Sequence, residues 1–359
     1  MTMRNDARLR ADLRTLAGYR ASILAHPPLR QLFLELTERC NEHCVHCGSR
    51  CGDTAPVEEL TLAEYKRILD DVARDFDLSK LRLAVTGGEP LLRKDFFDIL
   101  SYAKEKGFAW GMTTNATLID DDTAKSLYSC GMRTVSVSID GTRETHDRFR
   151  GIPGAYDRAM RGVEALTKQP FDNVQITSVI TKESIGELEE MFETFRETAI
   201  DSWRVIGIEP IGRAKERPDL MLSGEEQKRL LDFIKGKRRE GWPVTYGCSH
   251  FLGAAYERQV RDWYFLCNAG LYTMSILADG GIVACLDIER RPELLQGSVR
   301  TDDLKTVWET RFEAYRNEPA DLNERCRACA ERDFCHGGAR HSWDYDENRP
   351  LVCFKEILF

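Results

Sequence analysis

Between residues 31 and 210, short apolar segments alternate with amphipathic segments that place apolar residues at helical spacing. The apolar segments are typical of buried strands, and they are QLFLEL, LRLAVTGGEP, FAWGMTTN, RTVSVSID, NVQITSVI and SWRVIGIEP. The amphipathic segment after Thr61 also has a plausible helix cap. This alternation predicts six parallel strands with right-handed helical crossovers, in a sheet that is either doubly wound or curled into a barrel.

Four motifs follow the first four of these strands. A cysteine cluster follows the first strand, TGGEP the second, TTN the third and SIDG the fourth. Ligands of parallel α/β sheets gather at the carboxyl ends of the strands. We therefore expect the four motifs to converge on one site.

The length of 359 residues exceeds a usual single core, so we expect more than one domain. After about residue 236 the pattern changes, and LYTMSILADGGIVACLDI alternates around Asp279 as a β-hairpin does. A helix and a cysteine-rich tail follow it. We predict an N-terminal extension over 1–29, an α/β domain over 30–235 and a second domain over 236–359.

Charge and hydropathy exclude several classes of protein. A formal net charge of -8 gives no electrostatic basis for non-specific binding of nucleic acid. The first thirty residues lack the apolar core of a signal peptide, and no later run is apolar enough to span a bilayer. We expect a cytoplasmic protein that acts on a small molecule or a peptide, away from membranes and nucleic acid.

Twelve cysteines in such a chain indicate metal ligands or catalytic thiols. Three of them follow the spacing C-x3-C-x2-C, namely Cys40, Cys44 and Cys47. Three thiolates leave one iron of a cubic [4Fe-4S] cluster without a protein ligand. Tetrahedral zinc would need a fourth ligand, for which Cys51, His43 and His46 are available. The cysteines alone do not distinguish the two metals.

The stretch CNEHCVHC after one strand, with GGEP after the next, resembles the radical S-adenosylmethionine (radical SAM) enzymes over roughly residues 30 to 210. The family usually has an aromatic residue before the last cysteine, where this chain has His46. The resemblance implies a partial (β/α)6 barrel. It also implies an open iron that binds the amino and carboxylate groups of SAM, and a 5'-deoxyadenosyl radical that abstracts a hydrogen atom from the substrate.

The resemblance also implies contacts with SAM. Glycine at Gly87 and Gly88 would let the backbone approach the methionine amino group, where a side chain would clash. The candidate cofactor-binding residues are Gly87, Gly88, Glu89, Pro90, Asn115, Ser138, Asp140 and Arg150. Outside this context TGGEP indicates a turn, Asp140 with Gly141 is ordinary turn chemistry, and Arg150 is a solvated surface charge.

Residues 245 to 359 resemble the SPASM extension of radical SAM enzymes, which carries up to two auxiliary [4Fe-4S] clusters. The resemblance assigns an outer cluster to Cys326, Cys329, Cys335 and Cys353, and an inner cluster to Cys267, Cys285 and Cys248. Alone, the spacing of Cys326 and Cys329 would favour a zinc knuckle.

The chain departs from the SPASM pattern at one position. The family has a cysteine four residues after Cys335, and here that residue is Ala339. The inner site would then have a vacancy, or a ligand such as His336, His341 or Asp344. It could equally hold a [2Fe-2S] cluster or be lost.

Other residues near these cysteines have two readings each. Asp287, two residues after Cys285, is a candidate catalytic base or an exposed hairpin carboxylate. The aromatic run 263–265 could line a substrate channel or belong to the core. We expect Cys51 to be a spare or packed thiol, and Cys130 to be a small buried apolar residue.

SPASM-bearing enzymes commonly crosslink, epimerise or oxidise peptides. The resemblance therefore implies an oxidoreductase that matures a peptide or small protein, such as a ribosomally made natural product. Its partners would be that substrate and an electron donor such as flavodoxin or ferredoxin. About thirty residues precede the first strand, too few for a winged leader-binding domain, so we expect a separate leader-binding protein or another surface.

The expected cofactors are SAM, its [4Fe-4S] cluster and one or two auxiliary clusters. One alternative is a radical SAM dehydrogenase or tailoring enzyme for a small molecule, acting on an alcohol or a tetrapyrrole side chain. A remote alternative is a zinc-stabilised interaction protein without catalysis.

Overall fold

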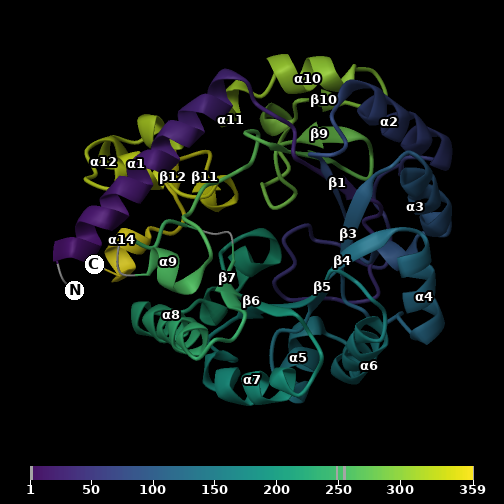
Figure 1. Cartoon of the computed structure of the whole chain (residues 1–359), viewed down its shortest axis with the longest axis horizontal. Helices are drawn as coiled ribbons and strands as arrows, with labels where there is room; N and C mark the ends of the chain where they lie inside the picture. Colours follow the sequence, from purple (N-terminus) through teal and green to yellow (C-terminus); the bar gives the residue numbers. More distant parts are fainter. Residues whose placement is uncertain (1–2, 248–249, 254–255, 359) are drawn as a thin grey trace.

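The computed structural model describes residues 3–247, 250–253 and 256–358. Its centre is a ten-stranded sheet in the order β10-β9-β8-β1-β2-β3-β4-β5-β6-β7. Figure 1 shows the strands curving around a common interior with helices on the outside. The strands are β1 (Gln31–Glu35), β2 (Arg82–Thr86), β3 (Ala109–Thr114), β4 (Met132–Ser138), β5 (Asn173–Ile180), β6 (Ser202–Gly207), β7 (Val244–Tyr246), β8 (Thr273–Ile276), β9 (Gly281–Val283) and β10 (Gly297–Ser298).

The six predicted strands are β1 to β6, and they pair in parallel in sequence order. The helices between them include α2 (Leu62–Asp75), α3 (Phe96–Glu105), α4 (Asp121–Ser129), α5 (Arg143–Arg150), α6 (Ala155–Thr167) and α7 (Leu188–Arg196). This alternation around a curved sheet confirms the predicted α/β fold and its barrel form (Figure 1).

The sheet extends beyond the six predicted strands at both edges. β7 pairs in parallel with β6, and β8 pairs in parallel with β1. β8 and β9 form the hairpin predicted around Asp279, and β10 pairs antiparallel with β9. The hairpin therefore belongs to the same sheet as the barrel strands. The domain boundary expected near residue 236 falls within α8 (Gly224–Arg239).

The first crossover helix shows how local sequence fixes an element. Thr61 accepts a hydrogen bond from the backbone of Glu64, and the Glu64 side chain accepts one from the backbone of Thr61, so the predicted cap is a full capping box. One face of α2 buries Tyr65, Ile68, Leu69 and Val72. Each such burial contributes about 1.5–3 kcal/mol before entropy is counted.

Helix α1 (Met3–Ala25) crosses the outside of the molecule beside the cysteine-rich C-terminal region (Figure 1). Leu13 and Leu16 of this helix are buried in one apolar cluster with Phe251, Tyr264, Phe265 and Ala339. Tyr264 and Phe265 therefore belong to a core. Trp263 is 52% exposed, so it packs little against that cluster.

The C-terminal region consists of short elements. Its helices are α9 (Glu257–Val260), α10 (Leu304–Thr310), α11 (Glu313–Arg316), α12 (Glu324–Arg327), α13 (Arg332–Cys335) and α14 (Phe354–Leu358), and its small second sheet pairs β11 (Trp343–Asp344) with β12 (Arg349–Pro350). Among the described residues, no helix combines the length and the apolar character needed to cross a membrane.

Candidate functional site

The cysteine loop, residues 36–61, connects β1 to α2 at the carboxyl end of the sheet. The loop folds back on itself, because the backbone NH of Cys40 donates to the carbonyl of Gly52 at 2.7 Å. Cys44 and Cys51 are buried, and Cys40 and Cys47 are partly buried. The turn thus brings the C-x3-C-x2-C segment over the end of the barrel, as the sequence predicts.

Two other segments hold this loop in place. The backbone NH groups of His43 and Val45 donate to the carbonyls of Arg150 and Phe149 at the end of α5, at 2.9 and 3.0 Å. Arg213 donates from its side chain to the carbonyls of Cys44, at 3.0 Å, and of Cys51. No sequence motif points to Arg213. Its only signal is its place shortly after the carboxyl end of β6.

Arg150 lies buried beside the cysteine loop, so the reading of it as a solvated surface charge is wrong. Its guanidinium donates to Glu42 at 3.1 Å and to Asp140 at 2.5 Å, and it lies 3.6 Å from the Cys44 sulfur. Burial opposes its charge, but these carboxylates and the thiol raise the pKa of Arg150 well above its ordinary value. A permanent positive charge therefore faces Cys44.

The three thiols differ in how readily they ionise, and Cys40 and Cys44 need a bound cation to become thiolates. Burial raises the pKa of Cys40 and of Cys44 to about 12, and Arg150 offsets this only in part at Cys44. A hydrogen bond with Cys51 is the main cause that lowers the pKa of Cys47 to about 6. Metal coordination deprotonates a thiol outright. Three thiols on one loop are the ligand type of an iron–sulfur cluster. As they stand in the described part of the chain, no three His, Cys, Asp or Glu side chains are arranged to hold a metal ion.

Two histidines near Arg150 are held neutral, His146 buried and His46 partly buried. His46 stacks on Phe149 with ring centroids 4.3 Å apart, and burial lowers its pKa to about 4. His146 accepts a hydrogen bond at Nδ1 from the backbone NH of Asp140 at 3.1 Å. Burial likewise lowers the pKa of His146 to about 4. Both histidines pack as structural residues here, His46 in the position that is usually aromatic in radical SAM enzymes.

Replacing His146 with glutamine is expected to reduce the loss of stability in acid. The pKa of His146 is about 4 in the folded chain against an ordinary value of 6.5, so the unfolded chain binds more protons between these values. The free energy of unfolding must therefore fall as the pH drops through this window, by about 2 kcal/mol at about pH 5 for this group. Anaerobic urea unfolding of both proteins at neutral and acidic pH measures the difference.

The control for this experiment is His26→Gln, at an exposed position. It should keep the pH dependence of the unsubstituted protein. Identical pH dependence in the His146→Gln variant would show that His146 is not held neutral in the fold.

The glycines of GGEP allow the second loop to contact the first. A side chain at Gly87 would overlap the carbonyl oxygen of Thr37, and one at Gly88 would overlap that of Arg39. The backbone NH of Gly88 donates to Thr37 at 2.7 Å. The immediate reason for both glycines is therefore the close approach of the two backbones, which also brings the motif against Cys40.

Glu89 connects the ends of neighbouring strands. It is fully buried and accepts hydrogen bonds from Thr114 Oγ1 and from the backbone NH of Asn115, both at 2.9 Å. Burial raises the pKa of Glu89 to about 7. Pro90 begins the short 3-10 helix (Pro90–Leu92) that Glu89 caps.

The remaining candidates for SAM contacts lie on the next strand ends. The Asn115 amide donates to Asn41 Oδ1 of the cysteine loop at 2.8 Å, a partner that the sequence analysis did not identify. Ser138 ends β4 and is half-buried. Asp140 accepts from the backbone NH of Val179 of β5 at 2.8 Å in addition to Arg150. The four motifs therefore meet at the carboxyl end of β1 to β4, as expected.

The four cysteines predicted to hold the outer cluster line one cavity, and they are Cys326, Cys329, Cys335 and Cys353. Cys329 Sγ accepts hydrogen bonds from the backbone NH of Glu331 at 3.4 Å and from Lys355 at 3.5 Å. NH and ammonium donors of this kind stabilise a thiolate. The cavity therefore brings together four thiols, the ligand type of an iron–sulfur cluster.

The inner site is less complete in the described part of the chain. Cys267 and Cys285 are half-buried, and the Cys267 sulfur accepts from the backbone NH of Arg340 at 3.5 Å. Cys248 lies outside the described residues. Ala339 is buried in the apolar cluster that also contacts Cys267.

The three proposed substitutes for the missing cysteine all have protein partners. His336 Nδ1 lies 3.0 Å from Glu318, and His341 Nε2 lies 3.4 Å from Glu209. Asp344 accepts from the backbone NH groups of residues 346 and 347 at 3.1 Å. The nature of the inner cluster stays a prediction.

Asp287 lines a cavity of about 190 Å³ between the cysteine loop and the segment after β9. Residues 48–50, which follow Cys47, form one wall, and residues 286–290 form another. His341 and Trp343 also line it. Asp287 is exposed, and its Oδ1 would lie 3.9 Å from a Cβ added at Gly48. Both readings of Asp287 are thus compatible with its position beside the cysteine loop.

Glu209 connects this cavity to the outer-cluster cavity. It is buried after β6, and its Oε2 lies 3.1 Å from His250 and 3.4 Å from His341. His250 lines the cavity of the four cysteines, and His341 lines that of Asp287. The two histidines hold the pKa of Glu209 well below its ordinary value despite burial. Glu209 lies in the predicted strand segment SWRVIGIEP, but none of the site motifs found in the sequence includes it.

Two family models match the chain. Residues 34–195 match the Radical SAM superfamily, and residues 267–330 match SPASM, an iron-sulfur cluster-binding domain. The first model covers the cysteine loop and the strand ends that meet it. The second covers Cys267, Cys285, Cys326 and Cys329.

Curated relatives of two kinds align over most of the chain. The AdoMet-dependent heme synthase of Methanosarcina barkeri is 28% identical over 348 residues, which are 91% of this chain and 97% of that protein. The mycofactocin maturase MftC of Mycobacterium tuberculosis is 31% identical over 310 residues, which are 85% of this chain and 76% of that protein. The two names describe different substrates.

A solved structure of similar fold is native anSMEcpe with bound AdoMet and the Cp18Cys peptide. It has a TM-score of 0.72 and 20% sequence identity, and the match covers 92% of this chain and 94% of that one. At this identity the likeness concerns the fold.

Proposed function

The chain belongs to the radical SAM superfamily and carries a SPASM domain, and from this we propose that it abstracts a hydrogen atom from a peptide or small protein during maturation of that substrate. The family assignment implies SAM and [4Fe-4S] clusters as cofactors. It therefore favours an enzyme over the alternative of a zinc-stabilised interaction protein. The observation that carries the proposal is the cavity beside the cysteine loop, with Asp287 on its wall.

In this proposal Cys40, Cys44 and Cys47 hold the cluster that binds SAM. Such a cluster with SAM supplies one-electron cleavage of the sulfonium and a carbon radical that abstracts hydrogen. The chain contributes position and burial. Arg150 stabilises the nearby Cys44 thiolate, and Glu89 fixes the strand ends that carry Asn115. Asn115, Ser138 and Asp140 remain candidate contacts for SAM.

Asp287 is proposed to accept the proton that leaves the substrate. Its cavity also contains cationic and apolar side chains, Lys215 and Trp343 among them, which suit a peptide segment. An oxidation also needs an acceptor for the second electron, and the four-cysteine cavity is the described site that suits such a group. The mycofactocin maturase that aligns over 76% of its own length supports this reading.

A second candidate is the modification of a tetrapyrrole side chain. It is favoured by one observation, which is that an AdoMet-dependent heme synthase aligns over 97% of its own length. Both candidates use the same cysteine loop, and they differ in the occupant of the cavity at Asp287.

The test uses the full chain, reconstituted anaerobically with iron and sulfide and reduced in the presence of SAM. We expect 5'-deoxyadenosine, together with a mass change in a peptide encoded near its gene. Asp287→Asn should still release 5'-deoxyadenosine but lose the modified peptide, whereas Glu293→Gln at an exposed surface ion pair should keep both. A mass change only in an iron tetrapyrrole with propionate side chains would overturn the peptide proposal in favour of the second candidate.

A further inference from the structure

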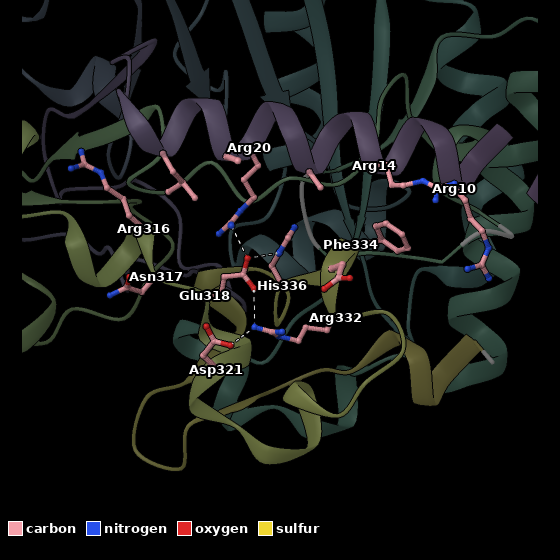
Figure 2. Close-up of a pocket in the computed structure, with 14 residues that line it drawn as sticks. Arg10, Arg14, Arg20, Arg316, Asn317, Glu318, Asp321, Arg332, Phe334 and His336 are labelled. Carbon is pink, nitrogen blue, oxygen red and sulfur yellow. Dashed lines mark hydrogen bonds and ion pairs between the residues drawn. The ribbon is translucent and has the colours of Figure 1, made fainter. Parts of the chain in front are cut away.

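A separate groove of about 760 Å³ lies between α1 and the segment 316–336 (Figure 2). None of the residues that line it belongs to the cysteine loop or to the cavity of Asp287. Its lining on α1 runs from Arg10 to Leu24, a length of about 21 Å at 1.5 Å per residue. An extended peptide of about six residues has this length.

Arginine dominates the charge of the groove. The lining contains five arginines, which are Arg10, Arg14, Arg20, Arg316 and Arg332, and three carboxylates, which are Glu318, Asp321 and Asp333. The chain as a whole has a net charge of -8, so this surface differs in sign from the molecule that carries it. Every cation is an arginine, and the guanidinium fork matches a carboxylate in two hydrogen bonds.

Two of the three carboxylates already have partners within the groove. Glu318 accepts from Arg20 at 2.8 Å and lies 3.0 Å from His336 Nδ1. Asp321 accepts from Arg332 at 2.5 Å. Figure 2 shows this network at the centre of the groove. These two acids are engaged at the centre of the groove. The third, Asp333, is exposed and interacts electrostatically with Arg332 and His336.

Arg316, at one end of the groove, has no carboxylate partner among the residues that the structure describes. It donates to the carbonyls of Gly270 and Glu309 at 3.2 Å and of Trp308 at 2.5 Å. Burial lowers the pKa of Arg316, and no acid raises it. A partly buried cation of this kind gains free energy from an incoming anion.

Arg14 lies toward the other end of the groove (Figure 2). Its side chain is exposed on α1, and it makes no ion pair within the described part of the chain. The two arginines that lack carboxylate partners are therefore separated along the groove. This spacing suits an elongated partner with several carboxylates better than a single compact anion.

We propose that this groove binds an acidic segment of the peptide substrate, apart from the residue that is modified. The inference rests on the proposed peptide substrate. Binding at the groove would hold the substrate to the enzyme through carboxylates while another part of it enters the cavity at Asp287. Recognition of acidic motifs by clustered arginines is a known mode of peptide binding.

The experiment measures fluorescence anisotropy of a labelled peptide of alternating Glu and Ala on the full, reconstituted chain. A peptide with Gln at every Glu position is the uncharged probe. We expect the Glu peptide to bind, and Arg14→Glu to weaken its binding by about tenfold, which is about 1.4 kcal/mol. Arg14→Lys keeps the charge without the fork and should give a smaller loss.

Arg8→Glu is the matched control, since Arg8 is an exposed arginine of the same helix that does not line the groove. It should leave binding within about twofold, because its charge is screened by solvent and salt. Equal losses of affinity for Arg8→Glu and Arg14→Glu, or equal binding of the Glu and Gln peptides, would overturn the proposal that the groove binds an acidic segment.

The failure of the groove and the failure of the peptide proposal are distinguishable in the same protein. If the enzyme changes the mass of a peptide but does not bind the Glu probe, only the proposal for the groove is refuted. A tetrapyrrole mass change, with no peptide product, refutes both.

Discussion

Replacing Cys40, Cys44 and Cys47 together with alanine is expected to abolish formation of 5'-deoxyadenosine. The three thiols lie on one loop at the carboxyl end of the barrel, and the permanent charge of Arg150 faces the middle one. Without them no described residue set of this loop can hold the cluster that delivers the electron. The measurement is anaerobic SAM cleavage by the reconstituted variant, with its iron content, which should fall by about four irons per chain.

Two single variants are the controls for this result. Cys130→Ala removes a buried thiol behind α4, and Cys51→Ala removes the buried thiol next to Cys47. Neither should reduce the iron content, although Cys51→Ala removes the hydrogen bond that lowers the pKa of Cys47. Wild-type SAM cleavage by the triple variant, or an equal loss of iron in Cys51→Ala, would contradict the assignment of the three ligands.

The sequence predicts the barrel well because its signals are local. Each of β1 to β6 is a short apolar run, and each is followed by a segment with helical periodicity. The parallel pairing of β8 with β1 is different, since it joins residues 31 and 273, which are far apart in the sequence. Nothing in either short strand specifies that pairing, so the hairpin was predicted while its place in the main sheet was not.

Motif spacing likewise predicts the cysteine loop, but it does not predict what holds the loop. Asn41 and Glu42 lie inside CNEHC and are residue types common on protein surfaces. Glu42 nevertheless contacts Arg150 at the end of α5, and Asn41 contacts Asn115 just after β3. Arg213 comes from a third segment. These contacts depend on how the loops pack over the sheet, and such packing leaves no periodic signal.

The glycines of GGEP also show that a sequence motif does not reveal which contact it makes. Their conformational freedom is visible in the sequence, and it suggests the approach of a ligand. The structure shows that Gly87 and Gly88 first accommodate the backbone at Thr37 and Arg39. A family motif can therefore be necessary for the loop to form before any cofactor contact is made.

Arg150 is expected to be the residue whose loss most destabilises the fold around the cysteine loop. Arg150→Met would leave Glu42 and Asp140 buried without their counterion, and breaking a buried pair in this way costs about 3–5 kcal/mol. Arg148 lies on the same helix, but its side chain and that of its partner Glu183 are exposed. Arg148→Met should therefore lower the free energy of unfolding by about 0–1 kcal/mol. Anaerobic urea unfolding of the two variants measures the contrast.

The origin of the cost can be tested by removing the orphaned charges as well. Adding Glu42→Gln and Asp140→Asn to Arg150→Met should recover part of the lost stability, because neutral amides bear burial better than unpaired carboxylates. Equal destabilisation by Arg150→Met and Arg148→Met would mean that solvent reaches both carboxylates. The thiolate at Cys44 would then depend on the bound cluster alone, whereas a large contrast means that the fold supplies a fixed counter-charge before the cluster is assembled.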